Sequence, residues 1–151
     1  MIHRKWTNKD PRQQFDKILG IALEKIGVVV LGQAKLLAPI QSGRLAGSLT
    51  YATRRSRSGI TAPATGNDAI DKPTVNNEVW VGTNVEYAPH VEYGTKSHMI
   101  NSAVNIPKVG WRYIGMHPGT QKQPYLRPAL KETRKDITRI FKETIGSEYG
   151  K

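Results

Sequence analysis

The chain has 151 residues, no cysteine and a formal net charge of +11 at pH 7. This length suits one domain with one modest core, so we treat residues 1–151 as a single domain. The lack of cysteine excludes disulfides, thiolate metal sites and cysteine nucleophiles. No long apolar run and no charged-then-apolar leader occurs, so we expect no membrane span, no secretory signal and synthesis in the cytoplasm.

The charge is unevenly distributed along the chain. Residues 1–60 carry +8, residues 61–95 carry −4 and residues 96–151 carry +7. A strongly basic balance indicates a polyanionic neighbour or an acidic protein surface. A basic body with an acidic middle is also compatible with head-to-tail pairing of identical copies in a ring.

The first part of the chain predicts a basic arm followed by a long helix. Residues 1–9 lack periodicity and are rich in basic residues. Asp10 is a candidate N-cap and Pro11 a candidate first helical residue. Apolar residues then recur at steps of three and four up to Leu37, which predicts one amphipathic helix that ends before Pro39.

A turn, a strand and a long loop are predicted next. Residues 39–49 are typical of a turn in which Arg44 is the only charge, and residues 48–56 alternate as a strand does. Residues 58–76 have no period and several Gly and Pro breakers, so we expect a mobile loop that orders on a partner. Candidate partner contacts in it are Asn67 and Asp68.

Residues 77–83 predict a second strand, which leads into an unusual stretch from Glu86 to Thr95. Pro89 suits the first turn of a short helix, and Gly94 suits the left-handed residue that ends one. The stretch can be a docking site that carries His90 and Glu92, or a buried helical turn whose apolar side holds Tyr87, Val91 and, less well, Tyr93. Apolar residues at helical spacing are usually core, which favours the second interpretation.

The remainder predicts a hairpin and a second helix. Residues 96–119 read as a projecting hairpin with its turn at 107–110, and we expect Trp111 and His117 on it to contact partners. From Leu130 onward, apolar residues recur at helical spacing, and Gly146 is the expected end of that helix.

An enzymatic role finds little support in the motifs. The histidines and the five acids of the middle segment are scattered, and neither helix nor strand geometry makes His90 and Glu92 joint ligands, although a hairpin could bring His98 and His117 together. No zinc-protease, phosphate-loop or serine-hydrolase motif is present. A nonspecific DNA-binding protein or a metal-dependent nuclease stays open as the alternative function.

Four short motifs, taken in order, resemble one known family. They are Ala38-Pro39 with Ser42-Gly43-Arg44-Leu45 and Ser48-Leu49; Val81-Gly82-Thr83; Tyr87-Ala88 with Val91-Glu92-Tyr93-Gly94-Thr95; and Gln123-Pro124-Tyr125-Leu126-Arg127-Pro128-Ala129-Leu130. Together they are similar to the tail-completion (neck, or head-tail joining) proteins of long-tailed bacteriophages. Tyr93 and Tyr125 stand where phenylalanine is common in that family.

The resemblance implies an α+β fold in which an antiparallel sheet is packed by a long N-terminal helix and a C-terminal helix, with long projecting loops. It also implies a structural virion protein without catalysis or cofactor. Copies of the protein would form a hexameric or dodecameric ring at the head-tail junction, through which DNA passes. The ring would contact the neighbouring connector and tail-tube proteins.

Two hypotheses about residues follow from that role. Arg54, Arg55 and Arg57, or the outer face of the last helix, are candidates to line a DNA channel. Glu92 is the candidate ion-pair partner of Arg44, within a packing junction made by Tyr87, Val91, Tyr93 and Gly94.

Overall fold

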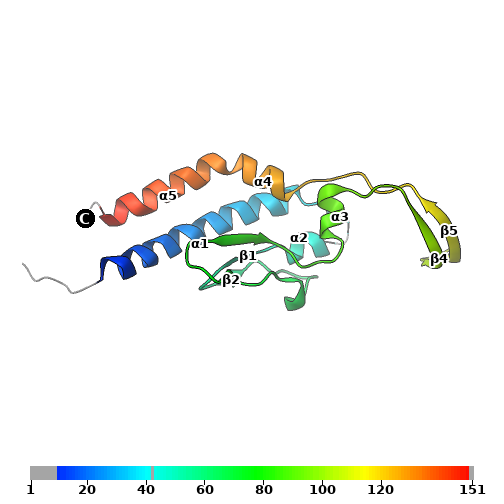
Figure 1. Ribbon diagram of the computed structural model, residues 1–151, viewed down its shortest axis with the longest axis horizontal. Helices are drawn as coiled ribbons and strands as arrows, with labels where there is room; N and C mark the ends of the chain where they lie inside the picture. The colour runs from blue at the N-terminus through cyan, green and yellow to red at the C-terminus, as the bar shows by residue number, and fades with distance from the viewer. Residues whose placement is uncertain (1–9, 42, 150–151) are drawn as a thin grey trace, which may run out of the picture.

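The computed structural model describes residues 10–41 and 43–149. The predicted arm at residues 1–9 and Ser42 lie outside the described residues. The chain forms a mixed α+β structure with one long helix at its centre (Figure 1). The predicted fold class is therefore confirmed.

The central helix, α1, spans Pro11–Leu37. Asp10 accepts a hydrogen bond from the Arg12 backbone N–H at 3.0 Å, and Pro11 occupies the first turn, as predicted. The helix ends at Ala38, which is extended because Pro39 follows it. The predicted long helix is thus confirmed at both ends.

A small sheet packs on one side of α1. After the short helix α2 (Arg44–Ser48), the strands β1 (Thr50–Thr53), β2 (Arg57–Ser58) and β3 (Val79–Gly82) pair antiparallel in the order β2-β1-β3. In register, Thr50 faces Gly82 and Tyr51 faces Ser58. The predicted strand at 48–56 is shorter than expected, because Ser48 still belongs to α2.

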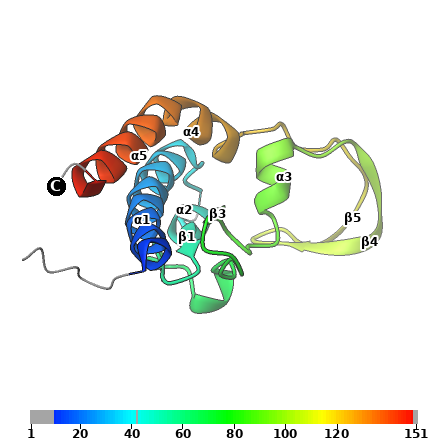
Figure 2. The ribbon, with the colours of Figure 1, turned by 60° about the vertical axis from the view of Figure 1, so that its left-hand side comes forward.

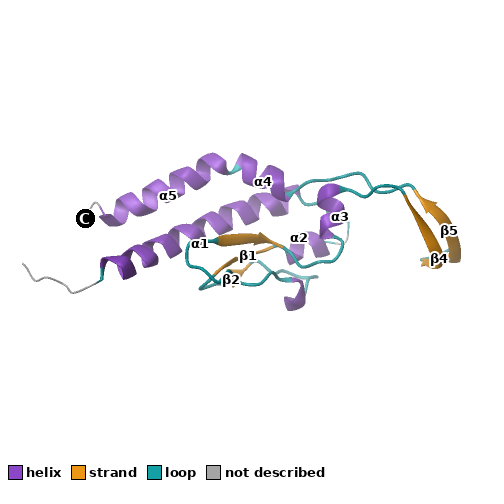
Figure 3. Cartoon of the chain, in the orientation of Figure 1, coloured by secondary structure: helices purple, strands orange, loops and turns teal. Residues whose placement is uncertain are grey.

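The C-terminal helices cover α1 from the other side. These are α4 (Leu126–Glu132) and α5 (Arg134–Tyr149), and both run alongside α1 (Figures 1 and 3). The expected single helix is broken at Thr133, whose hydroxyl bonds back to the Ala129 carbonyl at 2.8 Å, a contact that often bends helices. The expectation that Gly146 ends the helix is wrong, because α5 continues through Gly146 to Tyr149. A glycine is tolerated inside a helix, and no atom lies within 4 Å of the point where its Cβ would be.

The core lies where α1, α2, α3 (Ala88–Tyr93) and α4 meet. Its buried side chains include Leu49 and Tyr125, which are 0% and 1% exposed. The cluster comprises Leu31, Ala34, Ala38, Leu45, Leu49, Val85, Ala88, Tyr125 and Ala129. Tyr125 reaches this core from the segment just before α4, so the core joins residues that are far apart in sequence.

A second, separate element projects from this body. The strands β4 (His98–Ile106) and β5 (Gly110–His117) form a hairpin that extends beyond α3, away from α1 and the three-stranded sheet (Figures 1 and 2). The predicted hairpin and its turn are confirmed, with Lys108 in the turn at φ 69°. η1 (Gly66–Asp68) is the one helical turn described within residues 59–78.

The closest approach of α1 to the sheet depends on Gly27. A Cβ at this position would lie 2.6 Å from Cδ2 of Tyr51 and 3.0 Å from Cγ2 of Val79. Gly32, on the same helix, has no atom within 4 Å of the corresponding point. The two glycines therefore separate the effect of packing from that of helix propensity.

We predict that Gly27→Ala lowers the free energy of unfolding by about 1–3 kcal/mol, because overpacking outweighs the gain in helix propensity of about 1 kcal/mol. Gly32→Ala should raise it by up to about 1 kcal/mol. Urea unfolding followed by circular dichroism measures both. Equal stabilisation by the two substitutions would show that the sheet does not approach α1 this closely.

Candidate functional site

The carboxylate of Glu92 connects α3 to the start of α4. Glu92 is 3% exposed. Its Oε2 accepts the backbone N–H groups of Tyr125 and Leu126 at 2.7 and 3.0 Å, and its Oε1 accepts that of Arg127 at 3.2 Å. The first N–H groups of a helix have no partner within it, so Glu92 acts as an N-cap supplied from 33 residues away.

The side chain of Arg127 also contacts the Glu92 carboxylate. Its Nε lies 3.1 Å from Oε1 of Glu92, and its guanidinium carbon lies 4.8 Å from the centre of the Tyr93 ring. The Arg127 side chain is 59% exposed, so solvent screens the ion pair and it contributes little. The buried backbone hydrogen bonds carry most of the stabilisation.

The ionisation of Glu92 follows from these contacts. Burial raises the pKa of Glu92, but the hydrogen bonds from the Tyr125, Leu126 and Arg127 backbones and from the Arg127 side chain outweigh burial and hold the pKa below its ordinary value of 4.5. Burial, and then the charge of Glu92, raises the pKa of Tyr125 to about 12. The junction therefore contains one carboxylate and a neutral phenol at neutral pH.

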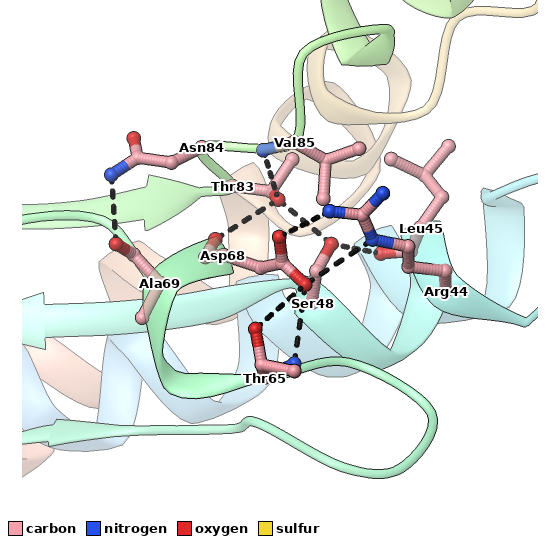
Figure 4. A network of polar contacts seen from close by, with 9 residues as sticks. All are labelled: Arg44, Leu45, Ser48, Thr65, Asp68, Ala69, Thr83, Asn84 and Val85. Carbon is pink, nitrogen blue, oxygen red and sulfur yellow. Dashed lines mark hydrogen bonds and ion pairs between the residues drawn. The ribbon is translucent and has the colours of Figure 1, made fainter.

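The predicted pairing of Arg44 with Glu92 is wrong. Arg44 Nη2 instead lies 2.7 Å from Oδ1 of Asp68, and Arg44 Nε lies 3.3 Å from Oδ2 (Figure 4). The hydrogen bond from Arg44, followed by that from the Thr65 backbone, holds the pKa of Asp68 below its usual value. The local sequence does not show which acid lies beside Arg44. In the folded chain, Arg44 pairs with Asp68, and Glu92 pairs with Arg127.

Asp68 belongs to a polar network that fastens the 58–76 loop to the body. The Asn84 backbone N–H donates to the Asp68 carbonyl at 2.8 Å, and the Asn84 side chain donates to the Ala69 carbonyl at 2.8 Å (Figure 4). The Thr83 hydroxyl lies 2.7 Å from the Ser48 hydroxyl oxygen. The loop that we expected to be a mobile projection is therefore anchored at the end of β3.

The side chain of Asp68 is 7% exposed, so the prediction that it contacts a partner is wrong. The sequence did contain a signal for its actual role. Thr65 and Asp68 stand three residues apart and form a capping box around η1. Asn67, the other predicted contact of this loop, is exposed, and its contact with a partner stays a prediction.

The structure places the four residues of the predicted junction differently. Tyr87 and Val91 are half-buried and pack against the core cluster. Tyr93 is 65% exposed and lies against Arg127 rather than in the core. Gly94 has φ 73°, and a Cβ there would lie 2.7 Å from the Thr120 carbonyl oxygen, so both conformation and space favour glycine.

The three arginines proposed for a channel lie together at the β1–β2 turn. Arg54, Arg55 and Arg57 are all exposed. Arg54 donates to the Asn76 side chain at 3.3 Å and Arg57 to the Ile70 carbonyl at 3.0 Å, and both acceptors are uncharged. The cluster therefore keeps much of its positive charge available to a polyanion.

The hairpin brings together the two histidines that are distant in sequence. His98 pairs with His117, and their ring centres are 5.1 Å apart. His117 Nδ1 accepts the Gly119 backbone N–H at 3.0 Å, which leaves its role as a partner contact a prediction. Trp111, the other predicted contact of the hairpin, is 73% exposed.

No three His, Asp or Glu side chains among residues 10–41 and 43–149 lie close enough together to hold a metal ion. Within the same residues, no helix has the length and apolar character needed to span a bilayer.

Sequence reasoning missed Arg127 as the partner of Glu92. A usable signal was Pro128, which is typical of a first helical turn and so marks N–H groups that need an acceptor. No spacing rule connects such a helix start to an acid 33 residues earlier.

We predict that Glu92→Gln lowers the free energy of unfolding at pH 7 by about 3 kcal/mol. The NH₂ group of the glutamine would face two of the N–H groups that now donate hydrogen bonds to the carboxylate, and those N–H groups would lose their acceptor. Urea unfolding at pH 7 measures the loss. Glu143→Gln, an equal change of charge at an exposed position of α5, is the control and should be nearly neutral.

The pH dependence follows from the lowered pKa of Glu92. Its contribution is fully present above about pH 4.5 and is lost as the pH falls through the lower pKa of the folded state. The stability gap between wild type and Glu92→Gln should therefore narrow as the pH falls below about 4.5. A gap that stays constant as the pH falls well below 4.5 would contradict a buried, ionised cap.

Comparison with known proteins gives one family. The model of the HK97 gp10-like family, described as "Bacteriophage HK97-gp10, putative tail-component", matches residues 7–94. The match covers more than half of the chain and ends at Gly94, the residue that closes α3 ahead of the hairpin. Neither the curated proteins nor the solved structures give a match. The chain belongs to the HK97 gp10-like family, and it is a structural component of a bacteriophage tail and hence of the virion.

Proposed function

We propose that copies of this chain form a ring at the interface between the phage head and tail, and that DNA passes through it. The ring would contain six or twelve copies, assembled in the host cytoplasm and bound to the neighbouring connector and tail-tube proteins. Membership of a tail-component family supports the location in the virion. The uneven charge of the chain supports head-to-tail contact between copies.

The observation that carries the DNA contact is the exposed cluster of Arg54, Arg55 and Arg57. Arg54 and Arg57 donate hydrogen bonds to the Asn76 side chain and the Ile70 carbonyl, which carry no charge. The positive charge of the cluster is therefore not neutralised by these contacts and can attract phosphates. Such contact is independent of base sequence, because it arises from counterion release. A channel wall needs this property, since every part of the genome must pass it.

The second basic surface is the outer face of α5. It exposes Arg134, Lys135 and Lys142 in the company of acids, and Arg139 pairs with Asp136 at 2.7 Å. Internal pairing lowers the net field of this face. The arginine cluster is therefore the better candidate for the channel.

We predict that replacing Arg54, Arg55 and Arg57 together by glutamine weakens binding to duplex DNA and reduces the slope of log K against log salt concentration by about 3. The matched control replaces Arg134, Lys135 and Lys142 by glutamine and should change the slope less. Fluorescence anisotropy over a salt series measures both variants.

The same variants introduced into the phage test the role in the virion. The cluster variant should assemble tails but deliver less DNA, which infectious titre per particle measures. Unchanged titre and unchanged slope would remove the arginine cluster from the channel. Electron microscopy of particles that shows no ring of this protein at the head-tail junction would overturn the proposed function itself.

A further inference from the structure

Within the part of the chain that the structure describes, the hairpin β4–β5 has no extensive packing against the body. Its extensive contacts are between its own two strands, and it stands clear of the body in both views (Figures 1 and 2). Met99 and Met116 face each other across the strands at 55% and 61% exposure, and Trp111 is 73% exposed. An isolated two-stranded hairpin is marginally stable in water, so these apolar groups call for a partner surface.

The base of the hairpin is held by close backbone contacts. Thr95 and Thr120 pair as an isolated antiparallel bridge. A Cβ at Gly119 would lie only 2.3 Å from the Thr95 carbonyl oxygen. The two segments that lead to the hairpin therefore lie side by side at its base.

The body carries an apolar groove beside an unpaired strand edge. β3 pairs only with β1 among the described strands, so its other edge can accept a further strand. A groove of about 260 Å³ runs between β3 and the C-terminal helices. Its lining is apolar except for Arg127, and comprises Ile26, Val30, Val79, Val81, Leu126, Arg127, Leu130 and Ile137. Leu130 is 56% exposed there.

Charge matches the hairpin to the two ends of β3. Residues 96–119 contain Lys96, Lys108 and Arg112 and no acid. Two exposed glutamates lie near the ends of β3 along the chain, Glu78 just before the strand and Glu86 after it. Trp80, 44% exposed on β3, donates its indole N–H to Glu78 at 3.0 Å and offers further apolar surface.

We propose that the β4–β5 hairpin of one copy docks on the β3 edge and groove of the next copy. The proposal rests on the ring proposed above and names the contact that builds it. Each copy gives one hairpin and receives one at a different surface, so the contact is heterologous, and it builds a ring when the rotation between successive copies closes. Apolar side chains would supply the contact area, and the lysines of the hairpin would meet Glu78 and Glu86.

The lack of cysteine allows a direct test by cross-linking in tails isolated from the phage. Val109→Cys places a thiol in the exposed hairpin turn, and Asn77→Cys places one just before β3. We predict that a chain with both substitutions gives a ladder of covalent multimers with a bis-maleimide, and that each single variant gives none. The matched control pairs Val109→Cys with Ser147→Cys on α5 and should give no ladder.

Wild-type tails provide a second measurement that needs no substitution. A zero-length reagent that joins amines to carboxylates should link Lys96 or Lys108 to Glu78 or Glu86 of another copy, identified by mass spectrometry. Hairpin-to-hairpin links in the Val109→Cys variant, or tails that contain the ring but give neither ladder nor lysine-glutamate links, would overturn this contact while the ring stands. Tails without a ring would overturn the proposed function instead.

Discussion

One buried carboxylate holds the two halves of this protein together. Glu92 lies at the end of α3 and accepts the first N–H groups of α4, across a gap of 33 residues in sequence. Every residue of the projecting hairpin lies within that gap. Because the carboxylate fixes where the chain leaves the body and where it returns, it also fixes the base from which the hairpin extends.

The rest of the structure divides around this contact. On one side, α1 is covered by the small sheet and by α4 and α5, and the core gathers near Tyr125. On the other side, the bridge between Thr95 and Thr120 leads to a hairpin whose extensive contacts, among the described residues, are between its own two strands. The hairpin therefore exposes apolar residues, Met99, Trp111 and Met116, on a basic element, and such exposed apolar surface is typical of an interaction site.

Local sequence patterns predicted the elements of this fold but not their ion pairs. The helix at Pro11–Leu37, the strand β3, the short helix closed by Gly94 and the hairpin all arise from spacing, capping and turn residues that act over a few positions. The partners of Arg44 and Glu92 depend on which distant segments meet, and local patterns do not specify that. The break at Thr133 and the continuation through Gly146 were missed because a hydroxyl back-bond and a tolerated glycine leave the apolar period intact.

The amide hydrogens of Tyr125 and Leu126 test the central contact most directly. N-terminal amides of a helix usually exchange quickly because they have no partner within the helix. If Glu92 accepts them in a buried site, their exchange at neutral pH, followed by nuclear magnetic resonance, should be slowed to a degree comparable with Ile26 in the middle of α1. Exchange of both amides at the rate of an unstructured peptide, while Ile26 stays protected, would contradict the account.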